Sequence, residues 1–181
     1  YAYFAAQLGV LPTQANDWGS DTIDQPVYDP NKEFYYLNPV GTEATIGANW
    51  DVQPGESYVI MVDGNLRVDN NIVVQSGGYL MWIVSGDVTI SPSVVQMEGI
   101  YLINGLLTTE SAGAGGDVAL VVSGSVAAWD GVVLNRDLGA AGNSSPAEQF
   151  VYRPDLLLSM PRKVKTFVMQ WREVPAGTFG N

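Results

Sequence analysis

The chain contains neither cysteine nor histidine in its 181 residues. Without cysteine it has no disulfide bonds and no thiolate chemistry, and the compartment is left open. Without histidine it lacks the most common general base and the most common metal ligand of proteins. Enzyme classes that depend on imidazole or thiolate groups are therefore excluded.

Basic residues are also scarce. Eight Lys and Arg residues face nineteen Asp and Glu residues, which gives a net charge of −11. A chain of this charge repels polyanions and anionic membrane surfaces. We therefore expect no nucleic-acid partner and no membrane insertion of this segment.

Long apolar runs are missing as well, since no stretch approaches the length that spans a bilayer. Residues 1–11 are apolar, but they lack a basic leader and stop at Pro12. We interpret them as a mature N-terminus or as a cut from a longer chain, and not as a signal peptide. The acidic, charge-poor composition, rich in small polar residues, favours an extracellular or cell-surface location.

The chain does contain a repeat between residues 58 and 134. Four apolar blocks each run into a turn glycine and continue as an alternating segment. The turn glycines are Gly64, Gly86, Gly105 and Gly124, spaced 22, 19 and 19 residues apart. A fixed period of β-branched and aromatic segments is typical of stacked β-coils. The pattern predicts an all-β fold, a single-stranded parallel β-helix (β-solenoid) of about five coils, and strand twist favours a right hand.

Residues 36–55 are interpreted as a degenerate first coil. A shift of 22 residues places Ala44 under Leu66 and Val52 under Val74. Three regions follow: a cap helix with a wrapping loop over 1–35, the solenoid over 36–138, and an extension over 139–181. The extension is expected to pack on the solenoid or to be exchanged from it.

The two ends of the chain have their own patterns. Residues 1–11 show helical spacing, and we expect a short helix that caps the open end of the solenoid or contacts another subunit. Residues 12–33 predict a long irregular loop along the solenoid side. Residues 149–155 predict an extended segment, and the alternation over 162–172 predicts a terminal strand.

Charge is distributed unevenly along the chain. Residues 1–60 carry one lysine and eight acidic residues, a net of −7, whereas residues 153–172 carry five basic residues and one aspartate, a net of +4. One interpretation is a solvated face with an intramolecular contact. The other is head-to-tail assembly, in which a basic end meets an acidic surface of the next copy. The assembly residues would be Arg153, Arg162, Lys163, Lys165 and Arg172, with Tyr1, Phe4 and Leu8 of the helix.

Metal binding and catalysis find little support in the pattern. The corner residues Asp63, Asp69, Asn70, Asn71 and Asp87 could in principle bind Ca²⁺, but the nonapeptide calcium-roll pattern is absent. Corner Asp and Asn residues normally stabilise turns. We therefore predict no metal, no cofactor and no catalytic residue.

The coils offer few candidate catalytic groups and several candidate sugar-binding groups. Asp87 and Asp130 could form a carboxylate pair, but their spacing does not require it, and Arg67 is the single basic residue of the middle coils. Several aromatic residues could form a sugar-binding platform or a core ladder. These are Tyr35, Tyr36, Trp50, Tyr79, Trp82 and Trp129.

A resemblance to a known family is found in the coil segments VDGNLRV and VSGDVTI and in the tail segments PAEQFVYRPDLLL and WREVP. They resemble a C-terminal β-solenoid domain of large, mostly uncharacterised bacterial cell-envelope proteins, and more distantly the bactofilin-type β-helices. The likeness extends from about Tyr36 to the tail, where Pro146, Arg153 and Trp171 are part of it. It implies a bacterial cell-surface setting and supplies no catalytic residues.

The sequence thus predicts a structural protein of the extracellular space or cell surface, without catalytic activity. Its expected partners are copies of itself, with which it would form a filament or surface layer. If it mediates adhesion, its partner is the surface to which it adheres. The alternative is a carbohydrate-binding or polysaccharide-processing β-helix module that recognises glycans.

Overall fold

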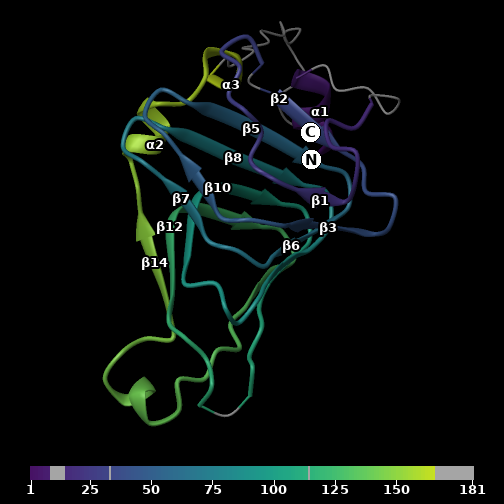
Figure 1. The fold of residues 1–181 in the computed structure, drawn as a ribbon. Coiled ribbons are helices and arrows are strands. Elements are labelled where there is room, and N and C mark those ends of the chain that lie inside the picture. The colour runs from purple at the N-terminus through teal and green to yellow at the C-terminus, as the bar shows by residue number, and fades with distance from the viewer. Residues whose placement is uncertain (9–14, 33, 114, 166–181) are drawn as a thin grey trace, which may run out of the picture.

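The computed structural model describes residues 1–8, 15–32, 34–113 and 115–165. Over these ranges the chain forms a parallel β-solenoid of about five coils, which confirms the predicted fold class (Figure 1). Each coil pairs its backbone with the coils on either side, so that short strands stack into two parallel sheets. The right-handed sense stays a prediction.

The six-stranded sheet contains one short strand from each coil and one from the preceding loop. In spatial order its strands are β1 (Thr22–Ile23), β3 (Glu43–Ile46), β6 (Asn65–Val68), β9 (Val88–Ile90), β11 (Leu106–Thr109) and β13 (Gly131–Val133).

The eight-stranded sheet contains the apolar blocks that precede the turn glycines. Its main path is β14 (Glu148–Tyr152), β12 (Leu120–Ala128), β10 (Gln96–Ile103), β8 (Tyr79–Val84), β5 (Ser57–Val62) and β2 (Phe34–Leu37). The strand β4 (Trp50–Val52) pairs with β7 (Ile72–Val74), which joins the sheet through β10.

The register confirms the first coil that the sequence predicted. Ala44 pairs with Leu66 in the six-stranded sheet, and Val52 pairs with Val74 between β4 and β7. Both pairs differ by 22 residues, as the shift required.

Four short helices complete the described part of the chain, and none of them is long and apolar enough to span a membrane. They are α1 (Ala2–Leu8), the 3-10 helix η1 (Gly139–Asn143), α2 (Asp155–Leu158) and α3 (Arg162–Lys165). The C-terminal helices α2 and α3 run back from β14 toward the end of the solenoid that holds β2 (Figure 1).

The terminal strand predicted over 162–172 is wrong for its first residues, which form α3. The Pro161 carbonyl accepts hydrogen bonds from the amides of Val164 and Lys165, both at 3.1 Å, and Val164 packs against the core. Proline is favoured at the start of a helix. The packing of Val164 against the core then determines the local structure more strongly than the weak alternation of apolar and polar residues does. Residues 166–172 of the predicted strand lie outside the described residues.

The central strands of the eight-stranded sheet are covered on both faces. All six residues of β8 are buried, although successive side chains of a strand point to opposite faces. One face lies inside the solenoid. The core also includes Leu156 of α2, and Tyr1, Phe4 and Val164 of the terminal segments pack against it. The continuous apolar blocks of the sequence therefore reflect burial on both faces of the strands.

The corners are held by side chains that reach from one coil to the next. The Asn65 Oδ1 atom accepts a hydrogen bond from the Asp87 amide at 2.9 Å, and the Asp87 Oδ1 atom accepts one from the Leu106 amide at 2.8 Å. A Cβ atom at Gly105 would lie 2.1 Å from that Asp87 oxygen, so glycine leaves the room for it. The Asn70 and Asn71 side chains likewise bond to the backbone of a neighbouring coil. For Asp87, Asn70 and Asn71 this confirms the interpretation of the corner residues as groups that stabilise the backbone.

Among the described glycines, Gly124 has the least room for a side chain: a Cβ atom would lie 1.8 Å from the Gly99 carbonyl oxygen, and φ is +144°. We expect Gly124→Ala to lower the free energy of unfolding by about 3 kcal/mol or more, because the β10–β12 ladder must move apart. Urea unfolding measures the loss. As a control, Gly19→Ala meets no heavy atom within 4 Å and should change stability by less than about 0.5 kcal/mol. Equal effects of the two substitutions would contradict this account.

Candidate functional site

The end of the solenoid that begins with β2 is closed by polar side chains acting as a substitute strand. The Asp17 carboxylate accepts the Tyr36 amide at 2.7 Å, and the Asp17 amide donates to the Tyr36 carbonyl at 2.9 Å. Asn16 repeats the pattern on Asn38, with both bonds of its side-chain amide between 2.7 and 2.8 Å. The free edge of β2 is thereby hydrogen-bonded without a further coil.

The same segment closes the other two sides of the first coil. The strand β1 pairs with β3, and the Asp21 carboxylate accepts the amides of Val40 and Gly41 at 2.8 and 2.9 Å. The Gln25 side chain bonds both backbone groups of Asp51, at 2.8 and 3.2 Å. We call residues 15–29 the closing segment.

Aromatic and aliphatic side chains of the closing segment cover the interior. Ile23 is fully buried, Trp18 lies 5.7 Å from Tyr35, and Tyr28 lies 5.8 Å from Tyr58 between ring centroids. Burial raises the pKa of Tyr58 to about 12. The loop predicted along the side of the solenoid therefore covers its end. The hydrogen bonds described above on the β2, β3 and β4 edges come from the closing segment and not from the predicted cap helix α1.

The opposite end of the solenoid is open. Val126 continues a row of fully buried side chains, and Val132 continues a second row in the six-stranded sheet. The first row is Ile60, Trp82 and Tyr101, and the second is Leu66, Val88 and Leu107. Among the described residues no further coil covers them, because β13 and β14 are the last strands of their sheets.

The exposed interior residues of this end form an apolar cavity of about 610 Å³. Val132 is 47% exposed, Phe150 46% and Tyr152 62%, although they occupy interior or edge positions of the last coil. We call the open end the surface formed by Val126, Val132, Leu134, Phe150 and Tyr152.

Charge is nearly absent from the strands of the open end. Glu148 is the single charged residue of β12, β13 and β14. Its carboxylate is turned toward the protein, where it accepts the Thr109 hydroxyl at 2.7 Å and the Arg136 amide at 3.1 Å. Exposed edge strands usually carry charges or prolines that prevent pairing with another chain. These edges carry no proline, and their one charged side chain, Glu148, is bonded within the molecule.

Arg153, predicted as an assembly residue, is engaged within the molecule. Its guanidinium donates to the Val74 carbonyl at 2.6 Å and to the Glu98 carboxylate at 2.7 Å, and it pairs with Asp155. Glu98 is 8% exposed and also accepts the Val74 amide at 2.8 Å. Hydrogen bonding to Arg153 holds the pKa of Asp155 below its ordinary value. We call this group the Arg153 clamp.

The other predicted assembly residues with described side chains lie in α3 and in the N-terminal segment. Arg162 and Lys165 lie in α3, where the Lys165 ammonium donates to the Leu158 carbonyl at 3.0 Å. Tyr1 and Phe4 pack against the core. The structure gives only the backbone of Leu8 and Lys163, and Arg172 lies outside the described residues. Head-to-tail assembly driven by charge stays a prediction.

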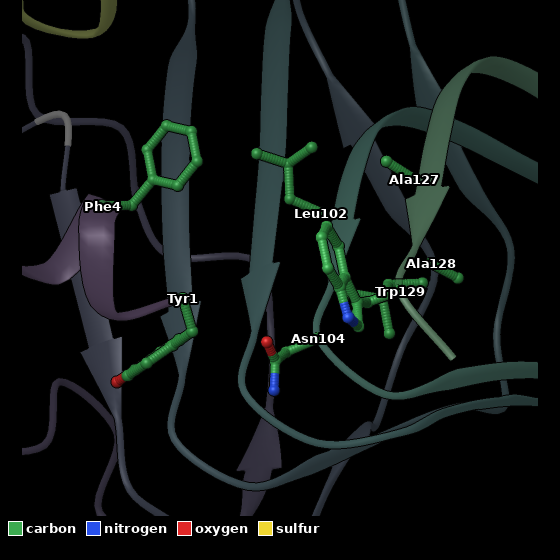
Figure 2. A pocket seen from close by; sticks show the side chains of 8 residues that line it. Tyr1, Phe4, Leu102, Asn104, Ala127, Ala128 and Trp129 are labelled. Atoms are coloured by element: carbon green, nitrogen blue, oxygen red, sulfur yellow. The ribbon is translucent and has the colours of Figure 1, made fainter. Parts of the chain in front are cut away.

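A second cavity, of about 250 Å³, lies between α1 and the outer side of β10 and β12 (Figure 2). Tyr1 and Phe4 form one wall, and Leu102, Ala127 and Trp129 form the other, with Asn104 on the floor (Figure 2). Burial, with Asp63 and Tyr36 nearby, raises the pKa of Tyr1. Trp129 is 87% exposed.

Trp129 is the one member of the predicted aromatic platform that faces solvent. The other five are core residues with exposures of 4% or less: Tyr35, Tyr36, Trp50, Tyr79 and Trp82. A continuous sugar-binding platform is therefore not formed by these six residues.

Of the two acidic residues considered for catalysis, Asp87 has a structural role. Asp87 stabilises a corner, as described above, and Arg67 holds Glu110 through two hydrogen bonds of 3.0 and 2.7 Å and also pairs with Asp69. The Arg67 contact lowers the pKa of Glu110. In the described ranges no three His, Cys, Asp or Glu side chains are grouped so that they could hold a metal ion.

Comparisons of the chain with family models, curated proteins and solved structures gave no match. The assignment of function therefore depends on the geometry of the two cavities and of the two ends.

Removing the carboxylate of Glu98 should break the Arg153 clamp. We expect Glu98→Ala to lower the free energy of unfolding by about 3 kcal/mol, because a mostly buried guanidinium loses one of its partners and the Val74 amide loses its acceptor. Urea unfolding measures the difference. The matched control is Glu110→Ala, whose ion pair with Arg67 is more exposed and should contribute less than about 1 kcal/mol. A loss at Glu98 no larger than the loss at Glu110 would contradict the proposed role of the clamp.

Proposed function

We propose that this is a non-catalytic structural protein that self-assembles through the open end of its solenoid. The observation that carries the proposal is the contrast between the two ends. One end is hydrogen-bonded and covered by the closing segment, whereas the other exposes the core row of Val132 and the ring of Phe150. Its extracellular or cell-surface location stays a prediction from composition and resemblance.

Physical chemistry favours association at this surface over others. The net charge of −11 opposes contact between copies over most of the molecule. The strands of the open end carry one charged side chain, Glu148, so repulsion is weak there and apolar area is available for burial. Free strand edges add unpaired backbone groups, which another chain can satisfy.

A second candidate function is carbohydrate binding at Trp129. Trp129, which is 87% exposed, lines a shallow cavity together with Asn104. Such an arrangement offers a stacking surface for a sugar ring next to a hydrogen-bonding group. This candidate depends on a different surface from the open end, so the two can be tested separately.

Placing a carboxylate on the open end should weaken self-association. We expect Val132→Asp to weaken it by about tenfold or more, because the charge would have to be desolvated in an apolar contact. Light scattering coupled to size exclusion, over a concentration series, measures the change.

The control is Val27→Asp, which adds the same charge at a valine that is 94% exposed on the closing segment. It should associate like the parent protein. Association through apolar contact should also persist as salt rises, whereas charge-assisted contact would weaken. A monomeric parent protein at all concentrations would overturn the proposal.

For the second candidate, Trp129→Ala should reduce glycan binding by about tenfold or more, since the stacking surface is lost. A glycan array, with competition by soluble sugar, measures binding. Tyr152→Ala is the control, because this tyrosine is 62% exposed but belongs to the open end. If the parent protein bound no glycan, or if the tyrosine variant lost as much, sugar binding at Trp129 would be excluded.

A further inference from the structure

We infer that two copies meet open end to open end about a two-fold axis, so that assembly stops at a dimer. This inference rests on the proposed function, because it specifies the partner and the geometry of the same surface. The partner is a second copy of this chain, and the contact uses the same residues on both subunits.

The closing segment leaves little free strand edge for stacking head to tail. A head-to-tail contact would have to add the open end of one copy to the edge of β2, β3 or β4 in the next. Those edges already bond to Asp17, β1 and Gln25. In the described residues the outermost strand of the six-stranded sheet at the closed end is the two-residue β1, whereas β13 and the five-residue β14 are outermost at the open end. Two copies that join like ends therefore bring the longer free edges together.

The symmetry determines how the strands would pair. An axis perpendicular to the solenoid and to β13 reverses the direction of β13 in one copy relative to the other. The strands β13 of both copies then become antiparallel neighbours. Antiparallel ladders are at least as stable as the parallel ladders within each coil.

The same operation brings the exposed interior residues together. Val132 and Leu134 of one copy would face the equivalent apolar interior of the other. The rows of buried side chains would run on across the contact. The closing segments would then lie at the two far ends of the dimer, where they prevent further growth.

The absence of cysteine from the chain permits a direct test. Val133→Cys places a thiol on β13, at the open end, and Thr22→Cys places one on β1, at the closed end. Each purified variant, and an equal mixture of the two, is treated with a mild oxidant and with a short bis-maleimide, which tolerates a shift in register. Circular dichroism checks that each variant folds. If Val133→Cys is unfolded, Leu134→Cys, at the next residue along the chain, replaces it.

The expected result is a covalent dimer from the β13 variant alone, no dimer from the β1 variant, and no mixed product. A mixed product that joins the two variants would overturn the two-fold contact in favour of head-to-tail stacking. Association in light scattering without cross-linking of either open-end variant would overturn the geometry and leave the proposed function standing. Monomers at every concentration would overturn both.

Discussion

Every coil of this protein depends on hydrogen bonds to the coil before it and the coil after it. The strands are short, so a single coil cannot satisfy its own backbone, and the stack has two edges where the pattern must end. At one edge Asn16, Asp17 and Gln25 imitate a strand with their side chains. At the other edge no described residue does so. The difference between the ends is thus a direct result of how the solenoid holds itself together, and it defines the surface available to a partner.

The close stacking of the coils also restricts which residues can occupy the corners. Coils approach so closely at Gly124 that the backbone of one coil would contact any side chain of the next. At other corners a carboxylate or amide fills the gap, as Asp87 does over Gly105. Acidic residues that look like metal ligands in the sequence are therefore needed by the backbone. This accounts for the abundance of Asp and Asn in a chain with a low content of other charged residues.

The repeat could be predicted from the sequence because glycine spacing and β-branched blocks are local signals. The 22-residue shift gave the pairing of Ala44 with Leu66 correctly. The closing segment could not be predicted, since its role depends on which backbone groups the fold leaves free. The same holds for Arg153, whose partners Val74 and Glu98 are 79 and 55 residues away. One signal was available for the open end: the strand segments after residue 119 carry almost no charge.

The Arg153 clamp gives this solenoid a property that simple repeat proteins lack. In an array where each coil contacts only its neighbours, the terminal coil can detach at low cost and the stack can fray stepwise. Here the residue directly after β14 is bonded to Val74, in a coil near the other end. Detachment of the last strand must therefore disrupt contacts deep in the stack. The clamp couples the open edge to global unfolding, so that the edge behaves as part of one cooperative unit and keeps a defined shape.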